Sequence, residues 1–298
     1  MLRIFPYRAQ KTSVTAGTLC AIRLDILVKM IQNNIMERIK AIDAEIYEFI
    51  THYKDLLLKY CSNNIIGIYL FGSLAYGGFD KDRSDIDIAV ITKELIKKLN
   101  IDTIKNIHKE MENINPKWSK RFEASYTSVE MLKENEPPKE PRPYYGKILH
   151  EEAKCEYEWL INNYLLYNYG ITIYGPEFKV LMKEPIKIKD VQEACRKDFY
   201  ERWLPSINEH ELFSNPDYCI YQSFVVLNTC RIIYTLYKSE LTNKQKACEW
   251  VEENYNEWTI LINEALNWRH GEVINKESEI KEFIGFAKKI IENETIEK

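Results

Sequence analysis

The sequence predicts an α+β protein, with an N-terminal mixed sheet and helices followed by a C-terminal all-α helical bundle. Three observations lead to this prediction. Short β-branched and aromatic runs alternate with amphipathic stretches in the first half of the chain. Long segments with apolar residues at three- and four-residue spacing fill the second half. The length of 298 residues is enough for two domains with a substantial core.

The first predicted element is an amphipathic helix. Apolar residues recur at three- and four-residue spacing from Ile39 to Tyr60, and the pattern ends at Cys61. Residues 1–29 carry basic residues but no acid before Asp25. Charged residues interrupt their apolar part, which therefore makes a poor signal-peptide core. We expect residues 1–29 to form a poorly ordered N-terminal extension.

A Gly-Ser turn follows the first predicted strand, and a pair of aspartates opens the second. Residues 65–71 are short, β-branched and aromatic, as is typical of a buried strand, and residues 85–91 form a second apolar strand. Gly72 allows a tight turn after the first strand. Ser73 is placed to cap a short helix, whose exposed N–H groups favour a phosphate.

The aspartate pair has the composition of a magnesium site. Asp85 and Asp87 are two residues apart and therefore share one face of their strand. Two neighbouring carboxylates repel each other unless a cation lies between them. Mg²⁺ prefers oxygen ligands and takes the rest of its shell from substrate phosphates and water. A phosphate-binding turn beside such a site is suited to nucleotidyl transfer.

A third carboxylate is predicted on the next strand. Residues 93–111 are expected to form a helix and residues 121–127 a strand, in which Phe122 and Glu123 point to opposite faces. Glu123 is the candidate general base, because a carboxylate beside two others has a raised pKa suited to accepting a proton. Glu130, which follows this strand, is the competing candidate.

The segment from Lys133 to Lys147 separates the two parts. It contains four prolines among charged residues, which excludes a helix or an inner strand. We expect a linker or a loop over the mouth of the site. Because the composition changes after it, the domain boundary is placed near residue 147. This gives a first domain over 30–147 and a second, helical domain over 148–298.

The C-terminal part is predicted to be a helical bundle. Its first helix, from His150 to Tyr169, opens with acidic residues that either interact with the helix dipole or form a negative wall for a cationic substrate. Thr242 or Asn243 is placed to cap a later helix. The other helices are predicted over 190–203, 218–237, 244–255, 258–268 and 277–291.

Composition restricts the partners. The net charge is −4, from 41 basic and 45 acidic residues, and there is no basic stripe, so nucleic acid is not an expected partner. The seven cysteines are scattered without metal-ligand spacing, which favours reduced thiols in the cytoplasm, without zinc or disulfides. No apolar stretch is long enough to cross a membrane. We expect a cytoplasmic monomer that binds a small cationic acceptor.

The front motif resembles the signature of the DNA polymerase β-type nucleotidyltransferase superfamily. In that signature an apolar residue and Gly-Ser precede a gap and then Asp-x-Asp in a strand. Here Phe71-Gly72-Ser73 is followed by Asp85-Ile86-Asp87. The resemblance implies a polymerase β-like nucleotidyltransferase domain over 30–147, with ATP and Mg²⁺ as co-substrate and cofactor. It also places an acid on the third strand, which supports Glu123.

The second half is similar to the helical domain of bacterial aminoglycoside adenylyltransferases that modify spectinomycin and streptomycin. The similar segments are Val225–Tyr234, Leu241–Trp250, Asn267–Gly271 and the short apolar Ile171–Pro176. Together with the front motif, the resemblance covers about residues 36 to 292. It implies a cleft between two domains, in which Mg-ATP and the drug meet.

The resemblance implies roles for the residues of the N-terminal part. Asp85, Asp87 and Glu123 would hold the metal. Gly72 and Ser73 would contact the phosphates of ATP. Glu123 would also be the base that deprotonates a drug hydroxyl.

The same resemblance implies roles for the residues of the C-terminal part. Arg231 and Lys244 would reach the triphosphate from the helical side. Trp268 stands where an aromatic residue lines the nucleotide site. Glu156 and Glu158 match acidic positions of the helix that faces the drug.

We therefore predict an ATP-dependent nucleotidyltransferase that adenylylates a hydroxyl of an aminoglycoside or aminocyclitol and gives antibiotic resistance. Two departures from the family favour spectinomycin over streptomycin. Tyr221 stands where relatives carry an acid, with Asp217 four places earlier, and no tryptophan matches the one that streptomycin-acting relatives use after the third strand. The alternatives are transfer to a protein side chain or an unknown metabolite, and a non-catalytic nucleotide-binding protein on the same fold.

Overall fold

The computed structural model describes residues 43–96, 98–133, 136–209, 213, 219–268 and 275–296. Several predicted features lie wholly or partly outside these residues, among them the extension 1–29, the first helix before residue 43, Asp217 and the segment 269–271. The first helix is described as α2 (Ala44–Cys61). The chain divides into two compact units, Met1–Tyr47 and Glu48–Lys298. The sheet and the C-terminal helices both belong to the second unit.

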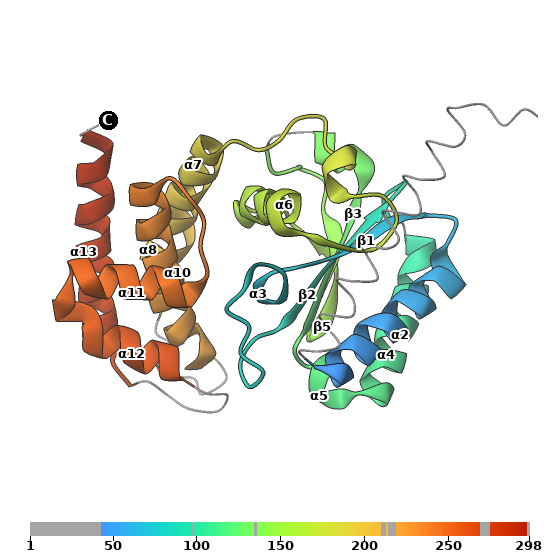
Figure 1. Cartoon of the computed structure of the whole chain (residues 1–298), viewed down its shortest axis with the longest axis horizontal. Coiled ribbons are helices and arrows are strands. Elements are labelled where there is room, and N and C mark those ends of the chain that lie inside the picture. The colour runs from blue at the N-terminus through green and yellow to red at the C-terminus, as the bar shows by residue number, and fades with distance from the viewer. Residues whose placement is uncertain are drawn as a thin grey trace, which may run out of the picture. The chain divides into compact units, whose positions relative to one another are not determined.

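A six-stranded mixed sheet forms the framework of the N-terminal part (Figure 1). In the order β5-β4-β3-β2-β1-β6, its strands are Ile148–Ala153, Arg142–Gly146, Phe122–Ser128, Ile86–Thr92, Ile65–Phe71 and Ile171–Tyr174. Strands β2 and β3 are parallel because helix α4 (Lys98–Ile114) connects them, and the other described neighbours are antiparallel. The α+β class and the three predicted strands are confirmed, each strand within one residue at its ends.

The two faces of the sheet have different environments, because side chains alternate along each strand. Phe122 and Tyr126 of β3 are buried on one face. There the Tyr126 hydroxyl lies 2.6 Å from the Tyr53 hydroxyl of α2 and 2.7 Å from His108 Nε2 of α4. Burial lowers the pKa of His108 to about 3, so this imidazole stays neutral inside the core. Glu123 alternates to the other face, which is left for the site.

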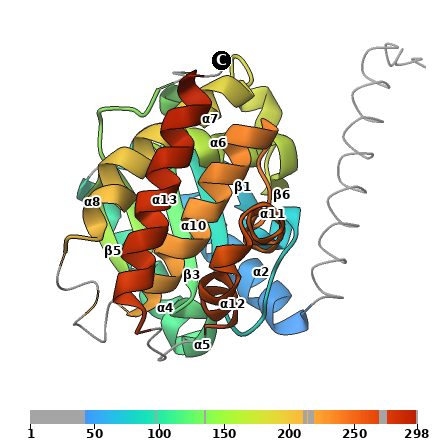
Figure 2. The ribbon, with the colours of Figure 1, turned by 90° about the vertical axis from the view of Figure 1, so that its left-hand side faces the viewer.

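Helices around α10 (Cys219–Lys238) form the C-terminal part. Helix α10 contacts α7, α11, α12 and α13, and Figure 2 shows α13 lying along it. The longer helices are α6 (Glu158–Tyr169), α7 (Ile188–Asp198), α11 (Lys244–Asn254), α12 (Thr259–Asn267) and α13 (Glu277–Ile296). A short helix of this part is α8 (Leu204–Ser206), whereas the short helices α3 (Ser73–Tyr76) and α5 (Pro116–Ser119) belong to the N-terminal part. Among the described residues, none of the helices combines the length and hydrophobicity that a bilayer-spanning helix requires.

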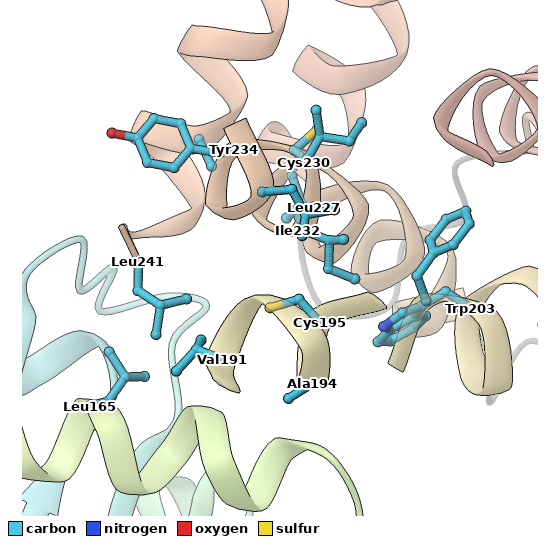
Figure 3. Packing of buried hydrophobic residues seen from close by; sticks show 14 of the residues in the cluster. Leu165, Val191, Ala194, Cys195, Trp203, Leu227, Cys230, Ile232, Tyr234 and Leu241 are labelled. Atoms are coloured by element: carbon cyan, nitrogen blue, oxygen red, sulfur yellow. The ribbon is translucent and has the colours of Figure 1, made fainter. Parts of the chain in front are cut away.

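One apolar core joins these helices to the sheet. Figure 3 shows Leu165 of α6, Val191 and Cys195 of α7 and Ile232 of α10 in the same interior region. Tyr69 of β1 belongs to the same cluster of buried residues. Because buried side chains of this kind are close-packed, the helical part is held in a defined position against the site-bearing face of the sheet.

The segment 142–146 corrects one prediction. It is strand β4, an inner strand between β3 and β5, although its prolines predicted a linker or a loop. Pro143 is tolerated because the pairing with β3 ends at Tyr144, and the pairing with β5 shifts register between Arg142 and Tyr144. Pro143 thus stands where neither neighbouring strand needs the N–H group that proline lacks.

A second correction concerns the residues after this strand. Residues 148–153 form strand β5, and the predicted helix from His150 begins only at Glu158. Lys147, with a positive φ of 65°, makes a tight turn that folds β5 back on β4, and this pairing overrides the helical pattern of the acidic run. The domain boundary near 147 stays a prediction, since the sheet takes β5 and β6 from beyond it.

The helix predicted over 93–111 is α4, which begins later, at Lys98, and ends at Ile114. The last helix, α13, ends at Ile296 rather than at residue 291. The other helices follow the predictions, with one local change. The segment predicted as a single helix over 190–203 is α7 followed by a π-helical turn, Phe199–Trp203. Pro205 comes just after this turn and has no N–H to continue the α-helical hydrogen bonds. The turn therefore changes the register of the helix at Glu201 and Arg202, two residues that line the cleft described next.

Candidate active site

A cleft of about 1770 Å³ is lined by the sheet, by α6 and α7, and by α10 and α11. All ten residues singled out from the sequence line it: Gly72, Ser73, Asp85, Asp87, Glu123, Glu156, Glu158, Arg231, Lys244 and Trp268. The fold therefore brings together residues that lie far apart in the sequence. Their immediate contacts define the chemistry available in the cleft.

The turn after β1 is built for close approach to Asp87. Gly72 has a φ of +66°, which favours glycine, and it is the N-cap of α3. Ser73 is the first residue inside the helix and its side chain makes no capping hydrogen bond, so the predicted Ser73 cap is wrong. A Cβ atom on Gly72 would lie 1.8 Å from Asp87 Oδ2. Phe71 and Asp87 are also paired in register across β1 and β2. The Gly-Ser turn and the aspartate strand are thus in direct contact.

Asp87 and Glu123 are neighbours across the parallel strands β2 and β3. They are paired in register, so both side chains lie on the cleft face. Burial, and then the charges of Glu123 and Asp85, raise the pKa of Asp87 well above its ordinary value. Burial also raises the pKa of Glu123. The pair therefore favours either a shared proton or a bound cation.

Asp85 stands one residue before β2 and is held by Arg121. The Asp85 Oδ1 atom lies 3.9 Å from Arg121 Nε. Arg121 also donates to the carbonyl of Lys81 at 2.7 Å and to that of Ser84, and its guanidinium carbon lies 4.8 Å from the centre of the Trp118 ring. This arginine therefore holds the loop before β2 in place and, with it, the position of Asp85 at the cleft.

Tyr144 forms a hydrogen bond with Glu123, the predicted general base. Its hydroxyl donates a 2.6 Å hydrogen bond to Glu123 Oε2, because Ser125 and Tyr144 are paired across β3 and β4 on the cleft face. This hydrogen bond offsets part of the rise that burial causes in the pKa of Glu123. Among the described residues, Oε1 of Glu123 has no hydrogen-bond partner, so it is the oxygen left for an acceptor.

Two cations line the cleft from the helical part. Arg231 lies on α10 and Lys244 begins α11, and within the described chain neither has an acid at ion-pair distance. The buried Nε of Arg231 has no hydrogen-bond partner there either. Burial, and then the charge of Arg231, lower the pKa of Lys244 to about 8, while Asp85 and Asp87 act in the opposite direction. Asp85 and Asp87 thus favour the charged form of Lys244, but within the described residues neither cation is engaged in an ion pair.

The start of α11 adds to this positive region. Asn243 is the N-cap, and its side chain accepts a hydrogen bond from the Lys246 N–H at 2.9 Å, which confirms the predicted cap. Lys244 is therefore the first residue of an 11-residue helix, whose N-terminus carries a partial positive charge. Trp268, which ends α12 and is 4% exposed, lines the same cleft. The N-terminus of α11 therefore favours the binding of a phosphate group.

Acidic residues gather near the start of α6 and the end of α7. Arg202 Nη2 pairs with Glu156 and, at 3.1 Å, with Glu158, while its Nη1 lies 3.6 Å from Asp198 Oδ1. Glu201 accepts a 2.9 Å hydrogen bond from a neighbouring tyrosine hydroxyl. All of these acids line the cleft, and they outnumber the one arginine among them. The wall is therefore negative overall and complements a cationic ligand.

The acids just before β2, on β2 and on β3 suit Mg²⁺ in their donor chemistry. Carboxylate oxygens are its preferred protein ligands, and a divalent cation would offset both the burial and the mutual repulsion that raise the pKa values of Asp87 and Glu123. Within the described chain, no three His, Cys, Asp or Glu side chains converge closely enough to enclose a metal by themselves. The assignment of Asp85, Asp87 and Glu123 as metal ligands therefore stays a prediction.

The structure separates Glu123 from its competitor. Glu130 lies on the short helix Val129–Lys133, pairs with Lys133 at 2.6 Å and is not among the residues that line the cleft. Tyr221, at the position where an acid was expected, does line the cleft and is 44% exposed.

Sequence reasoning missed several residues of this cleft. Arg142 and Tyr144 alternate within β4, so their shared face would have been visible had the strand been recognised behind its prolines. Asp198 and Arg202 are four residues apart, a spacing that predicts a contact on a helix. Arg121, which holds Asp85 from outside the cleft lining, precedes β3 without any sequence signal that would single it out.

Two family descriptions match successive parts of the chain. "Polymerase beta, Nucleotidyltransferase" matches residues 54–133, and "Aminoglycoside adenylyltransferase, C-terminal domain" matches residues 184–290. The first match contains the Gly-Ser turn and all three acids, and the second contains both unpaired cations.

Similar proteins carry related names. The chain is 28% identical to a spectinomycin 9-adenylyltransferase of Campylobacter jejuni over 204 residues, which are 63% of this chain and 70% of that protein. It is 28% identical to the protein of the same name from Enterococcus faecalis over 222 residues, 70% of this chain and 80% of that protein. A spectinomycin adenyltransferase from Enterococcus faecalis, solved with ATP and spectinomycin, has the same fold, with a TM-score of 0.67 at 23% identity over 83% of this chain and 99% of that one.

Proposed function

Because this chain belongs to the aminoglycoside adenylyltransferase family and is an ATP-dependent nucleotidyltransferase, we propose that it transfers AMP from ATP to a hydroxyl of a cationic aminoglycoside or aminocyclitol. One observation supports this most. Arg231 and Lys244, which have no acid partner within the described residues, line the same cleft as three carboxylates. A triphosphate supplies the negative charge that the cations lack. The cation that accompanies it supplies the positive charge that the carboxylates lack.

The nucleotide would lie between the turn after β1 and the helical part. Ser73 and the backbone at Gly72 would contact the phosphates. Arg231 and Lys244 would neutralise the charge that develops on the leaving pyrophosphate. Trp268 would line the nucleotide site beside them.

Glu123 would act as the general base. The acceptor oxygen attacks the α-phosphorus and loses its proton to Glu123, and a new O–P bond forms. The bond from the α-phosphorus to the oxygen bridging to the β-phosphate breaks, and pyrophosphate leaves with that electron pair. Tyr144 keeps the carboxylate oriented through its hydrogen bond to Oε2. The raised pKa of Glu123 makes it a better base than an ordinary glutamate near neutral pH.

Asp85 and Asp87, with Glu123 beside them, are the residues that would hold Mg²⁺. When bound, the ion neutralises and orients the triphosphate. Asp85 is kept in place for this role by Arg121, and Asp87 by its contact with Gly72.

The acceptor would be cationic because of the acidic wall. Glu156 and Glu158 would contact its ammonium groups, with Asp198 behind them. Spectinomycin is favoured over streptomycin by the names of the relatives and by Tyr221, an aromatic residue at a cleft position where an acid was expected. Adenylylation of the drug would give antibiotic resistance.

The proposal places the enzyme in the cytoplasm, where ATP is available and thiols stay reduced. Cys155, which lines the cleft, is a free thiol. All the residues named here come from one chain, so the proposal needs no second copy and takes the enzyme to be a monomer.

Pyrophosphate release tests this function. Purified chain is incubated with Mg-ATP and either spectinomycin, streptomycin or no acceptor. We expect release that depends on an acceptor and is fastest with spectinomycin, and a Glu123→Gln variant should be at least about a hundredfold slower. ATP binding without release for any aminoglycoside would contradict the proposal and direct the search to a protein or metabolite acceptor.

A further inference from the structure

Arg142 is a buried cation at the cleft that the reaction described above does not use. It is 6% exposed and lines the same cleft as the catalytic acids. Its guanidinium carbon lies 5.7 Å from the centre of the Trp159 ring and 5.9 Å from that of Tyr144. Among the described residues it has no acid at ion-pair distance and makes no side-chain hydrogen bond, and its Nε is fully enclosed.

A buried guanidinium in this environment has a charge that no acid among the described residues balances and N–H groups that no acceptor there satisfies. The two aromatic rings stabilise its charge in part, but they satisfy none of its N–H groups. A purely structural arginine at this depth is ordinarily paired with an acid or with carbonyl oxygens. Because Arg142 lines the cleft, oxygen atoms of a bound molecule can reach its guanidinium group.

The order of the strands places Arg142 on the acceptor side. Ser73 follows β1, Asp87 lies on β2, Glu123 on β3 and Arg142 on β4, next along the sheet. A general base has to reach the acceptor hydroxyl, so the acceptor lies on the side of Glu123 that is away from the phosphates. Tyr144 contacts both Glu123 and Arg142 and so joins the base to this end of the cleft.

We infer that Arg142 forms an acceptor subsite in which its guanidinium donates hydrogen bonds to paired oxygen atoms, such as vicinal hydroxyls or a carbonyl and its neighbouring hydroxyl. The inference rests on the proposed function, since it takes the acceptor to be the molecule that reaches Glu123. The planar fork of N–H groups matches paired oxygens and repels an ammonium. With Glu156 and Glu158 on the same wall, the cleft selects a polyhydroxylated amine over a simple polyamine.

Two-substrate kinetics of Arg142 variants test this subsite. The acceptor is spectinomycin or, if it is turned over faster, streptomycin, with Mg-ATP as donor. Arg142→Met should raise the KM for the acceptor at least about tenfold and leave the KM for ATP within about twofold, because only acceptor hydrogen bonds are lost. Arg142→Lys keeps the charge but loses the fork, and its acceptor KM should lie in between.

Arg196→Met is the matched control. It removes an arginine of α7 that donates to the Ile291 carbonyl at 3.2 Å and lies outside the cleft, and it should leave both KM values unchanged. If the melting temperature of Arg142→Met is well below that of the wild type, the test relies on Arg142→Lys. A raised KM for the acceptor in that folded variant still supports the subsite.

The outcomes separate the two proposals. Wild-type turnover with an unchanged acceptor KM in the folded Arg142 variants overturns the subsite alone. A parallel rise in the KM for ATP also overturns it, because Arg142 would then belong to the nucleotide site. Wild-type protein that transfers AMP to neither drug contradicts the proposed function, and the subsite, which rests on it, is then rejected as well.

Discussion

At the residue scale, Asp87 lies close to three other residues of the site. The backbone of Gly72 approaches it closely, Glu123 lies beside it across β2 and β3, and Asp85 is two residues away. Burial and the two negative charges raise its pKa, so the charged form is unfavourable in the folded protein. This arrangement reduces stability and is expected to be kept because it binds cations.

Asp87→Asn should therefore separate activity from stability. We expect AMP transfer to be lost, and the free energy of unfolding near neutral pH, measured in EDTA, to rise by about 0.5–2 kcal/mol. The sign follows from linkage. A group with a raised pKa in the folded state contributes stability below its unfolded pKa, and this contribution is lost as the pH rises through the folded pKa. The gain of the variant over wild type should thus grow with pH and disappear in acid.

Thermal denaturation at a series of pH values measures this difference. Millimolar Mg²⁺ is the internal control, because it should stabilise the wild type more than the variant and reduce the gap. An asparagine variant that is less stable than wild type near neutral pH in EDTA would show that Asp87 is not under electrostatic strain.

Lys244 should give the nucleotide site a limit at alkaline pH. Burial and Arg231 lower its pKa to about 8, so the free enzyme loses a triphosphate-binding charge above that pH. We expect kcat/KM for ATP to fall roughly tenfold per pH unit beyond it. Lys244→Arg keeps its charge over this range and should flatten the profile. A wild-type profile that stays level well above pH 8 would refute this role.

At the element scale, the turn after β1 combines a backbone requirement with a packing requirement. Gly72 and Gly77 both have positive φ values, of 66° and 98°. A Cβ atom would meet Asp87 at Gly72, whereas at Gly77 nothing lies within 4 Å. The two glycines therefore differ in what an added methyl group would displace.

Gly72→Ala should be far more damaging than Gly77→Ala. Backbone strain costs about 1–3 kcal/mol at either site, but at Gly72 the methyl group must also push Asp87 aside. We expect at least about a hundredfold loss in kcat for Gly72→Ala and no more than about tenfold for Gly77→Ala. Pyrophosphate release and thermal melting on both variants provide the comparison. Equal losses in kcat would mean that the Asp87 contact has no special importance.

Strand β4 presents its two adjacent tyrosines to opposite faces. Tyr144 donates to Glu123 on the cleft face. Tyr145 is 7% exposed and stacks on His108 with ring centres 3.7 Å apart on the core face. Removing either hydroxyl is the same chemical change in two different settings.

Tyr144→Phe should lower kcat by about tenfold without changing the KM for ATP, because the base loses the donor that orients it. Tyr145→Phe is the control, and it should affect the melting temperature at most. Steady-state kinetics with both substrates varied tell the two apart. A Tyr144→Phe enzyme with wild-type kcat would show that Glu123 needs no positioning from β4.

At the scale of the whole molecule, the sequence predicted most of the site and less of the sheet. The acids on β2 and β3 follow from strand alternation, which local sequence reports well. Strands β4 and β5 were missed because Pro143 and an acidic run contradict strand propensity locally. Strand β4 pairs with β3, which is distant in the chain, and β5 then pairs with β4. A local pattern carries no information on the contact with β3.

The residues from the helical part illustrate a different limit. Arg231 and Lys244 have the ordinary sequence context of surface cations, and only the family resemblance singled them out. Their significance lies in the absence, within the described chain, of an acid to pair with, which only the folded structure reveals. Arg142 was not singled out from the sequence, because the prolines beside it hid the strand that carries it. The roles of all these residues stay predictions that the variants above test.

The central claim is that AMP passes from ATP to a hydroxyl of a cationic drug in this cleft. Mass spectrometry of spectinomycin and streptomycin after incubation with Mg-ATP and the purified chain tests it most directly. We predict a product heavier by one adenylyl group with wild-type protein, formed from spectinomycin in preference, and none with Asp87→Asn. Unmodified drugs after prolonged incubation with folded, ATP-binding protein would contradict it.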